Sequence, residues 1–146
     1  MIWIDQITKA VWFQIFEEVP SNYRSQKRYL DSVQEPRQLS KSIDGNFDSS
    51  FVISEKNYLY GICEINNRDY LFSLNLQKSK QDIHCIKKFK NFAAELSSNT
   101  SANLLSWIEW DSPYMPWEKN DLFFAQIDLN GEIQNCLLYT SPSPRD

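Results

Sequence analysis

Apolar and polar residues alternate with a period of two in short segments along most of the chain. The clearest segments are rich in aromatic and β-branched residues and run over 57–65, 69–74, 103–110 and 121–127. Asn, Asp, Ser, Lys or Gly bound each one, which is the pattern of β-strands joined by polar turns. Helical turns can be drawn over 12–18 and 92–96, but a strand is the better interpretation at both places. The chain is therefore predicted to be all-β.

These segments recur as a repeat of about 45–50 residues. Leu59 and Ile62 have counterparts 46 positions later, at Leu105 and Ile108, and residues 69–72 resemble residues 52 positions later. The six additional residues are predicted to form a loop. A four-stranded unit repeating at this spacing is typical of a β-propeller. A generic antiparallel sandwich is the alternative, and the repeat disfavours it.

The repeat predicts about two and a half antiparallel four-stranded blades of an incomplete propeller over residues 1–135. The first blade, near 1–40, has predicted strands at 2–5, 10–16 and 36–40. The second, over 47–88, has predicted strands at 47–53, 57–65, 69–76 and 82–88. The third, over 92–135, has predicted strands at 92–96, 103–110, 121–128 and 132–135. Asn130-Gly131 is predicted to form the last hairpin turn, because both residues tolerate positive φ.

Composition and net charge limit the partners that this chain is expected to bind and exclude a disordered protein. The chain has 146 residues, a net charge of −4 and a sequence pI near 5.0. This balance argues against nucleic acid or an anionic membrane as a partner, because either favours a basic surface. A hydrophobic content of 42% and an aromatic content of 14% are enough to build a core, which excludes global disorder.

Several chemistries are excluded by the small number of glycines, histidines and cysteines. The three glycines are far apart, so the chain contains no P-loop, dinucleotide-binding glycine motif or nucleophile elbow. His84 is the single histidine and is interpreted as a polar strand residue. Cys63, Cys85 and Cys136 form no metal-ligand spacing. We therefore expect no catalytic triad, metal site or cofactor in this chain.

The two ends of the chain have distinct sequence features. The N-terminus has neither a basic region nor a long apolar run, so no signal peptide is predicted. Together with the lack of a disulfide framework, this favours a cytoplasmic location. Residues 136–146 match, codon for codon, the translation of a transposon-end adapter used in sequencing libraries. We expect this segment to be a non-native tail and the natural reading frame to continue beyond Asn135. The true start is expected to lie before Met1.

Residues 107–118, Trp-Ile-Glu-Trp-Asp-Ser-Pro-Tyr-Met-Pro-Trp-Glu, combine aromatic residues with prolines at a predicted strand end and the following loop. Prolines stiffen a loop, and buried rings anchor it. We therefore predict that Trp107, Trp110 and Trp117 are largely buried near this corner.

This stretch, followed by residues 121–128, resembles the WxxWDxPxMPW segment of bacterial prolyl oligopeptidase-family serine peptidases of the dipeptidyl aminopeptidase/acylaminoacyl-peptidase-like group. The matching residues are Trp107, Trp110, Asp111, Pro113, Met115, Pro116 and Trp117. The chain departs from the family pattern at Ser112, Tyr114 and Glu118, where the family commonly has His, Asn and Asp. Residues 35–39, Glu-Pro-Arg-Gln-Leu, resemble the family's EPRxL outer strand.

The resemblance implies the N-terminal propeller of a serine peptidase that hydrolyses short peptides. Its partners would be peptide substrates and its own C-terminal α/β-hydrolase domain, which carries the catalytic residues and is absent here. The propeller would limit access to short peptides. Glu109 and Asp111 can in principle meet a substrate amine, but hydrogen-bonded or solvated carboxylates are the favoured interpretation. The alternatives are a stand-alone propeller that binds a protein or ligand, and an unrelated β-sandwich.

Overall fold

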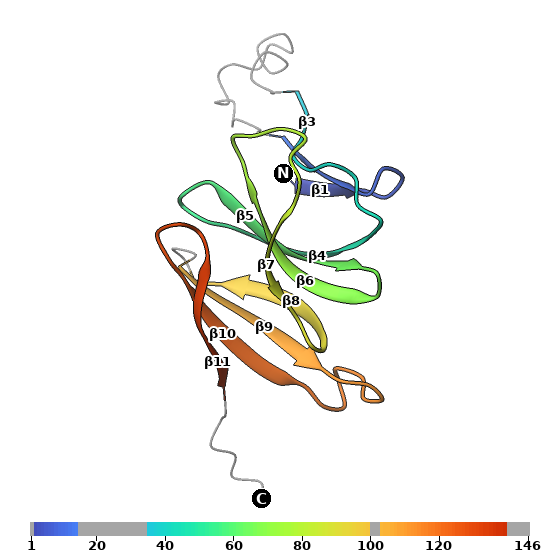
Figure 1. The fold of residues 1–146 in the computed structure, drawn as a ribbon, viewed down its shortest axis with the longest axis vertical. Helices are drawn as coiled ribbons and strands as arrows, with labels where there is room; N and C mark the ends of the chain where they lie inside the picture. Colours follow the sequence, from blue (N-terminus) through green and yellow to red (C-terminus); the bar gives the residue numbers. More distant parts are fainter. Residues whose placement is uncertain (1, 15–34, 100–102, 140–146) are drawn as a thin grey trace, which may run out of the picture.

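The structure, a computed structural model, describes residues 2–14, 35–99 and 103–139, and within these ranges its regular elements are all β-strands (Figure 1). The strands are β1 (Ile2–Asp5), β2 (Ala10–Phe13), β3 (Arg37–Gln38), β4 (Gly45–Ile53), β5 (Tyr58–Ile65), β6 (Arg68–Asn75), β7 (His84–Lys88), β8 (Phe92–Ser98), β9 (Leu104–Trp110), β10 (Asp121–Ile127) and β11 (Ile133–Tyr139).

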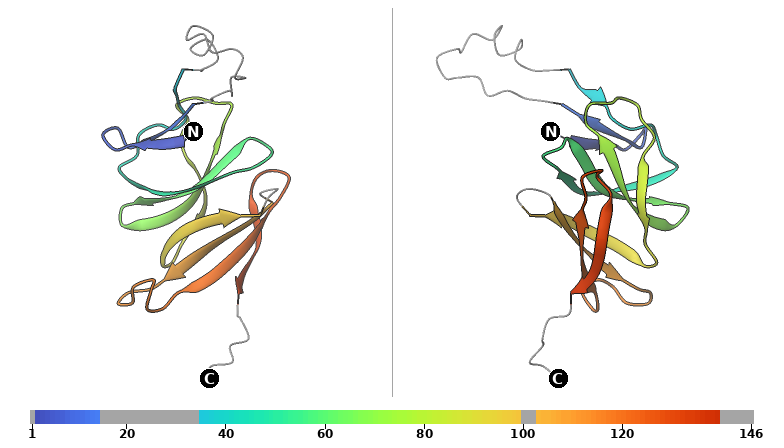
Figure 2. Two further views of the ribbon diagram at one scale, coloured as in Figure 1. Left: turned by 180° about the vertical axis from the view of Figure 1, so that it is seen from behind. Right: turned by 60° about the vertical axis from the view of Figure 1, so that its left-hand side comes forward.

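The strands form three antiparallel sheets that succeed one another along the chain. Their strand orders are β1-β2-β3, β4-β5-β6-β7 and β11-β10-β9-β8, so consecutive strands are neighbours within each sheet. Figures 1 and 2 show the three sheets stacked in the order of the sequence. The molecule is thus an incomplete β-propeller, in which the second and third blades have four strands and the first has three.

Most strand predictions are confirmed, with differences at their ends. β8 confirms the strand interpretation of residues 92–96, and β9 pairs with β10 as predicted. The predicted strand 10–16 ends at Phe13, and its last two residues lie outside the described part of the chain. The predicted outer strand 36–40 is reduced to the two residues of β3.

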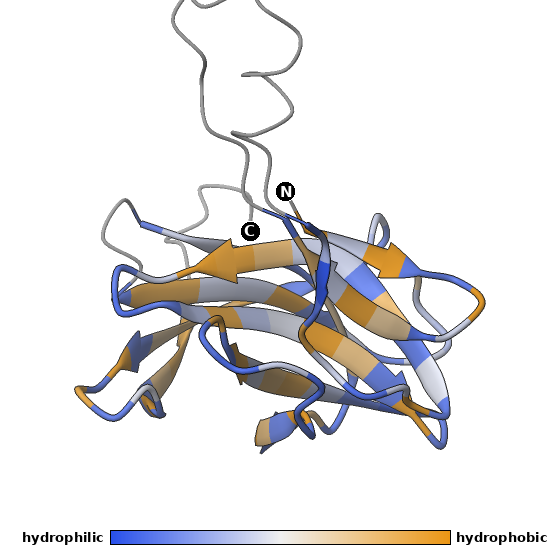
Figure 3. Cartoon of the chain, turned by 90° about the horizontal axis from the view of Figure 1, so that it is seen from above, coloured by the Kyte–Doolittle hydropathy of each residue, from blue (hydrophilic) through white to orange (hydrophobic). Residues whose placement is uncertain are grey.

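The middle blade has a hydrophobic core on each of its faces. Leu59 and Phe72 pack with Val11 and Leu39 of the first blade. On the opposite face, Ile62 packs in one cluster with residues of the third blade. Burial on both faces explains why β5 is almost continuously apolar rather than strictly alternating. Figure 3 shows hydrophobic positions concentrated in the strands and hydrophilic positions in the turns.

The strand register confirms one part of the repeat and corrects another. Cys63 pairs with Tyr70, and 46 positions after Cys63, Glu109 pairs with Asp121. The third strands of the two blades, β6 and β10, therefore correspond at an offset of 51 residues, and the predicted offset of 52 residues is wrong. A one-residue slip moves every side chain to the other face of the sheet. The error arose because both segments begin with Asp followed by apolar residues, although those aspartates do not occupy the same register position.

Polar contacts join each blade to the next. Between the first two blades, the buried Ser40 forms a parallel bridge with Gln81, and the Gln81 amide donates to the Leu39 carbonyl at 3.0 Å. Between the second and third, the Leu96 amide donates to Oγ of Ser50 at 3.1 Å. The Ala93 amide donates to Oδ2 of Asp69 at 2.9 Å. These bonds fix the sheets relative to one another beyond what apolar packing requires.

Residues 136–139 of the expected non-native tail extend β11 in its pairing with β10. The side chains of Leu137, Leu138 and Tyr139 remain between 48% and 64% exposed. This extension therefore adds backbone pairing with β10 but does not bury its apolar side chains. The remaining tail residues, 140–146, lie outside the described part of the chain. The adapter origin of the segment stays a prediction.

Candidate functional site

The family-like stretch occupies the end of β9 and the connection from Asp111 to Asn120. This connection is held by hydrogen bonds within itself. The Tyr114 amide donates to the Asp111 carbonyl at 2.9 Å, and the Glu118 amide donates to the Met115 carbonyl at 2.9 Å. The Met115 amide in turn donates to Oε2 of Glu118, also at 2.9 Å. The peptide bond between Ser112 and Pro113 is cis. We call this connection the Trp/Pro loop.

Trp107 is fully buried between the second and third blades, as predicted. Its ring stacks on Phe123, with ring centroids 6.2 Å apart, and packs against Phe89 at 5.6 Å. Its indole Nε1 donates to Oε2 of Glu109 at 3.0 Å. A buried indole needs such an acceptor, so Glu109 is a hydrogen-bonded carboxylate in line with the favoured interpretation.

The predicted burial of Trp117 is wrong, because its side chain is 77% exposed. Tyr114 and Met115 of the same loop are also exposed. Several backbone groups of the loop are hydrogen-bonded within it, which holds its shape while these side chains are presented to solvent. Trp110 is half-buried and stacks on Phe92 at 5.8 Å between ring centroids.

Two adjoining cavities open beside the Trp/Pro loop. One, of about 270 Å³, is lined by Glu109, Trp110, Tyr114 and neighbouring loop residues. The other, of about 220 Å³, lies toward the β5–β6 turn and includes Asp69. Both cavities share Asn91, Asp111 and Ser112. Burial raises the pKa of Asp69, although the Ala93 amide bond opposes that rise. The family-like motif thus frames a polar hollow at one end of the junction between blades.

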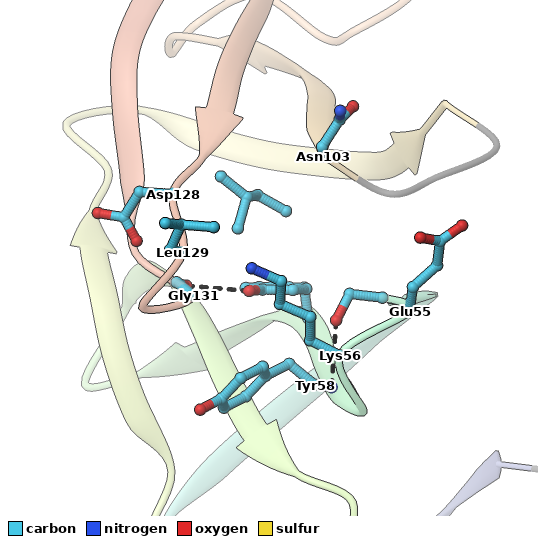
Figure 4. A pocket seen from close by; sticks show the side chains of 10 residues that line it. Glu55, Lys56, Tyr58, Asn103, Asp128, Leu129 and Gly131 are labelled. Atoms are coloured by element: carbon cyan, nitrogen blue, oxygen red, sulfur yellow. Dashed lines mark hydrogen bonds between the residues drawn. The ribbon is translucent and has the colours of Figure 1, made fainter.

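A third cavity, of about 320 Å³, lies between the β4–β5 and β10–β11 turns (Figure 4). The phenol of Tyr60 donates to the Gly131 carbonyl at 2.9 Å, and burial raises the pKa of Tyr60 to about 12. The side chains of Lys56, Tyr58 and Leu129 are among those that line it. Sequence analysis did not indicate this cavity, because its residues come from turns far apart in the chain and form no motif.

The turn between β10 and β11 is shaped by Asp128 rather than by Asn130-Gly131 alone. Oδ1 of Asp128 accepts hydrogen bonds from the Glu132 amide at 3.0 Å and the Asn130 amide at 2.8 Å. These bonds hold the pKa of Asp128 below its ordinary value, and the bond from the Glu132 amide has the larger effect. Gly131 has a φ of +81°, which confirms its predicted role as a turn glycine.

The surroundings of the single histidine and of two cysteines do not favour nucleophilic chemistry. His84 lies on β7, as predicted, and its Nε2 is 2.6 Å from Oε1 of Glu132. Burial raises the pKa of Cys63 to about 12 and also raises the pKa of the exposed Cys85. Neither environment activates a thiolate.

No group of three His, Cys, Asp or Glu side chains is placed to hold a metal ion among the described residues. The part of the chain that the structure describes likewise contains no helix long and apolar enough to cross a membrane.

Comparison with known proteins supports the fold rather than a family. No protein-family model and no curated protein matches this sequence. Among solved structures, a mutant of puromycin hydrolase complexed with PGG is similar, with a TM-score of 0.71 and 14% identity over 94% of this chain. Another structure of puromycin hydrolase has a TM-score of 0.68 and 16% identity over the same share. The chain spans 21% of the length of each. The chain therefore has the fold of part of a much longer hydrolase.

Proposed function

We propose that this chain is part of the substrate-gating propeller of a serine peptidase that hydrolyses short peptides. The observation that carries the proposal is the structural likeness to puromycin hydrolase, which covers 94% of this chain but 21% of that enzyme. The family-like residues 107–117 agree with it, because they form one defined corner of a blade. Short peptides and a catalytic domain of the same protein would be the partners.

The structure suggests how such a propeller would contribute. The blades supply a rigid wall, since cores on both faces of the middle sheet fix neighbouring blades to each other. A complete ring of this kind would admit extended peptides and exclude folded proteins. The bond-breaking chemistry would come from a Ser, His and Asp in the α/β-hydrolase domain, through an acyl-enzyme that water hydrolyses. In the described residues, Nε2 of His84 lies 2.6 Å from a carboxylate oxygen of Glu132.

A stand-alone binding module is the second function that the sequence left open. It would use the same blades without a hydrolase domain. The gene beyond residue 135 separates the two functions, because a peptidase requires a serine between closely spaced glycines after the propeller. A module would instead continue with further blades and then stop.

The test is to express the extended gene and treat the product with a fluorophosphonate probe for serine hydrolases. We expect one labelled serine beyond residue 135 and turnover of aminoacyl or dipeptidyl chromogenic substrates. Alanine at that serine is the matched control and should abolish both signals. A product with further blades, no labelled serine and no turnover would contradict the peptidase proposal. Turnover by a purified, monomeric 1–135 chain would contradict the assignment of catalysis to another domain.

A further inference from the structure

The turn between β10 and β11 connects the second and third blades away from the strands where they meet. The edge strands β4 and β8 contact each other, and we call this side of the two blades the inner edge. The opposite edge strands are β7 and β11, which form the outer edge. Toward the outer edge, the phenol of Tyr60 donates to the Gly131 carbonyl, and Nε2 of His84 lies 2.6 Å from Oε1 of Glu132.

This turn is closely seated on β5. A Cβ added at Gly131 would lie 3.3 Å from Oη of Tyr60 and 3.4 Å from Cε2 of Tyr58, and Gly131 has a positive φ. The Glu132 amide donates to Oδ1 of Asp128 at 3.0 Å, which restrains the backbone on its other side. The turn therefore presents the Glu132 carboxylate to β7 from a fixed backbone.

Of the two bonds that the turn makes to the second blade, the one from His84 is open to solvent. The side chains of His84 and Glu132 are 60% and 45% exposed, whereas Tyr60 is fully buried. Histidine changes its charge between about pH 5 and 8, and a charged ring binds a carboxylate more strongly than a neutral one. Burial raises the pKa of Tyr60 to about 12, so the buried bond does not respond in that range.

The other charged groups beside His84 on its own strand and its approach have partners of their own. Nζ of Lys41 lies 3.3 Å from Oδ1 of Asp82. Lys87 lies over an aromatic ring, with its ammonium 6.0 Å from the centroid. Burial raises the pKa of Cys85, so this neighbour stays a neutral thiol near pH 7.

The elements packed around His84 supply no second charged contact to its ring among the described residues. β6 pairs with the histidine through Ser73, and the charged residues of β6 are at its other end. β5 contributes the phenols of Tyr58 and Tyr60. Asp128 accepts hydrogen bonds within its own turn, and Lys56 of the β4–β5 turn acts on Asp128. Glu132 is therefore the group that responds to the charge of the histidine.

We propose that His84 and Glu132 form a proton-sensitive clasp that holds the outer edges of the second and third blades together. When the histidine is protonated, Nε2–H donates to the carboxylate and the opposite charges attract. Loss of the proton removes this attraction, so the turn opens more often. Tyr60 and Gly131 also line the cavity of about 320 Å³, so the width of that cavity follows the clasp. This inference does not require the peptidase function.

The test measures hydrogen exchange of the 146-residue chain by mass spectrometry at about pH 6 and about pH 8, on either side of histidine titration. Each rate is divided by that of the unfolded chain at the same pH, which removes the intrinsic pH dependence of exchange. We expect residues 128–135 to be better protected at the lower pH by about two- to threefold, the scale of an exposed ion pair. Peptides from β4 and β8 at the inner edge should show no such difference.

Glu132→Gln keeps an acceptor for the ring N–H and removes the charge, so the difference between the two pH values should disappear. Asp82→Asn is the matched control, because it removes another carboxylate close to His84 in sequence and should keep the difference. Equal protection of the unchanged chain at both pH values would overturn the proposal. So would a difference that persists in Glu132→Gln or is lost in Asp82→Asn. The first comparison needs no variant and remains decisive if a variant fails to fold.

Discussion

The indole Nε1 of Trp107 donates a 3.0 Å hydrogen bond to the carboxylate of Glu109, two positions further along β9. Residues two apart in a strand share a face, so both side chains enter the space between the second and third blades. The ring supplies apolar burial and the carboxylate satisfies its one donor. This pair makes the end of β9 a fixed support for the Trp/Pro loop that follows it.

Trp107→Ala should be strongly destabilising, by about 3–5 kcal/mol, because it leaves a cavity among buried aromatic rings. Trp117→Ala is the matched control in the same motif and should change stability by no more than about 0.5 kcal/mol, since Trp117 is 77% exposed. Urea unfolding followed by circular dichroism measures both. Equal costs for the two variants would show that the buried corner is not the structural centre of the loop.

Gly61→Ala should also destabilise the protein, by about 1–3 kcal/mol, through overpacking. A Cβ at Gly61 would lie 2.7 Å from Cζ of Phe72, whose ring is fully buried and has little room to move. Ser97→Ala, at an exposed position of β8, is the control with little expected effect. The measurement is again the midpoint of urea unfolding. An unchanged midpoint for Gly61→Ala would mean that the core on this face of the middle blade is loosely packed.

Stability should fall as the pH rises from about 9 toward 12, in part through Cys63. Its pKa is about 12 in the folded chain and near the ordinary value of 9 when unfolded. The unfolded thiol therefore loses its proton first, so rising pH favours the unfolded state across that window. Free energies of unfolding measured at several pH values should decline less steeply for Cys63→Ala. An identical slope in that variant would contradict the buried position of the thiol.

The outward face of the third blade should cause self-association. Ile108 and Trp110 alternate with the buried Trp107 and Glu109, so they lie on the face away from the second blade. An apolar sheet face without a neighbour favours association. We expect oligomers in sedimentation or light-scattering measurements, and a shift toward monomer for Ile108→Lys. Glu118→Gln, outside this face, should leave the oligomers unchanged. A monomeric starting chain would contradict this prediction.

The adapter origin of residues 136–146 is tested by reading the parent locus from unamplified DNA. We expect the natural sequence to diverge after Asn135. If the locus encodes Ser-Pro-Ser-Pro-Arg at that point, the tail is natural and the prediction is wrong. A chain ending at 135 should also lose the ladder between β10 and residues 136–139, which hydrogen exchange of the β10 amides would reveal.

Local sequence determined the strands and their order. Alternating apolar positions and polar turns place β5, β6, β9 and β10 within a few residues of their observed bounds, because these signals act over neighbouring residues. The repeat of Leu59 and Ile62 at Leu105 and Ile108 indicated stacked blades for the same reason. The repeat did not predict the offset of 51 residues between the third strands, β6 and β10. Register depends on which residues pair across a sheet, and the aspartates Asp69 and Asp121 at similar places in the sequence hid a shift of one residue.

Tertiary structure decided which of the motif's side chains are buried and where cavities form. Trp107 and Trp117 carry the same side chain in one motif, yet one is enclosed by Phe89 and Phe123 and the other projects from a loop that bonds to itself. The burial of the Glu109 carboxylate likewise depends on the approach of the second blade. Composition and periodicity report the tendency of a segment to bury its face, but burial of one particular ring or carboxylate depends on elements distant in sequence that close over it.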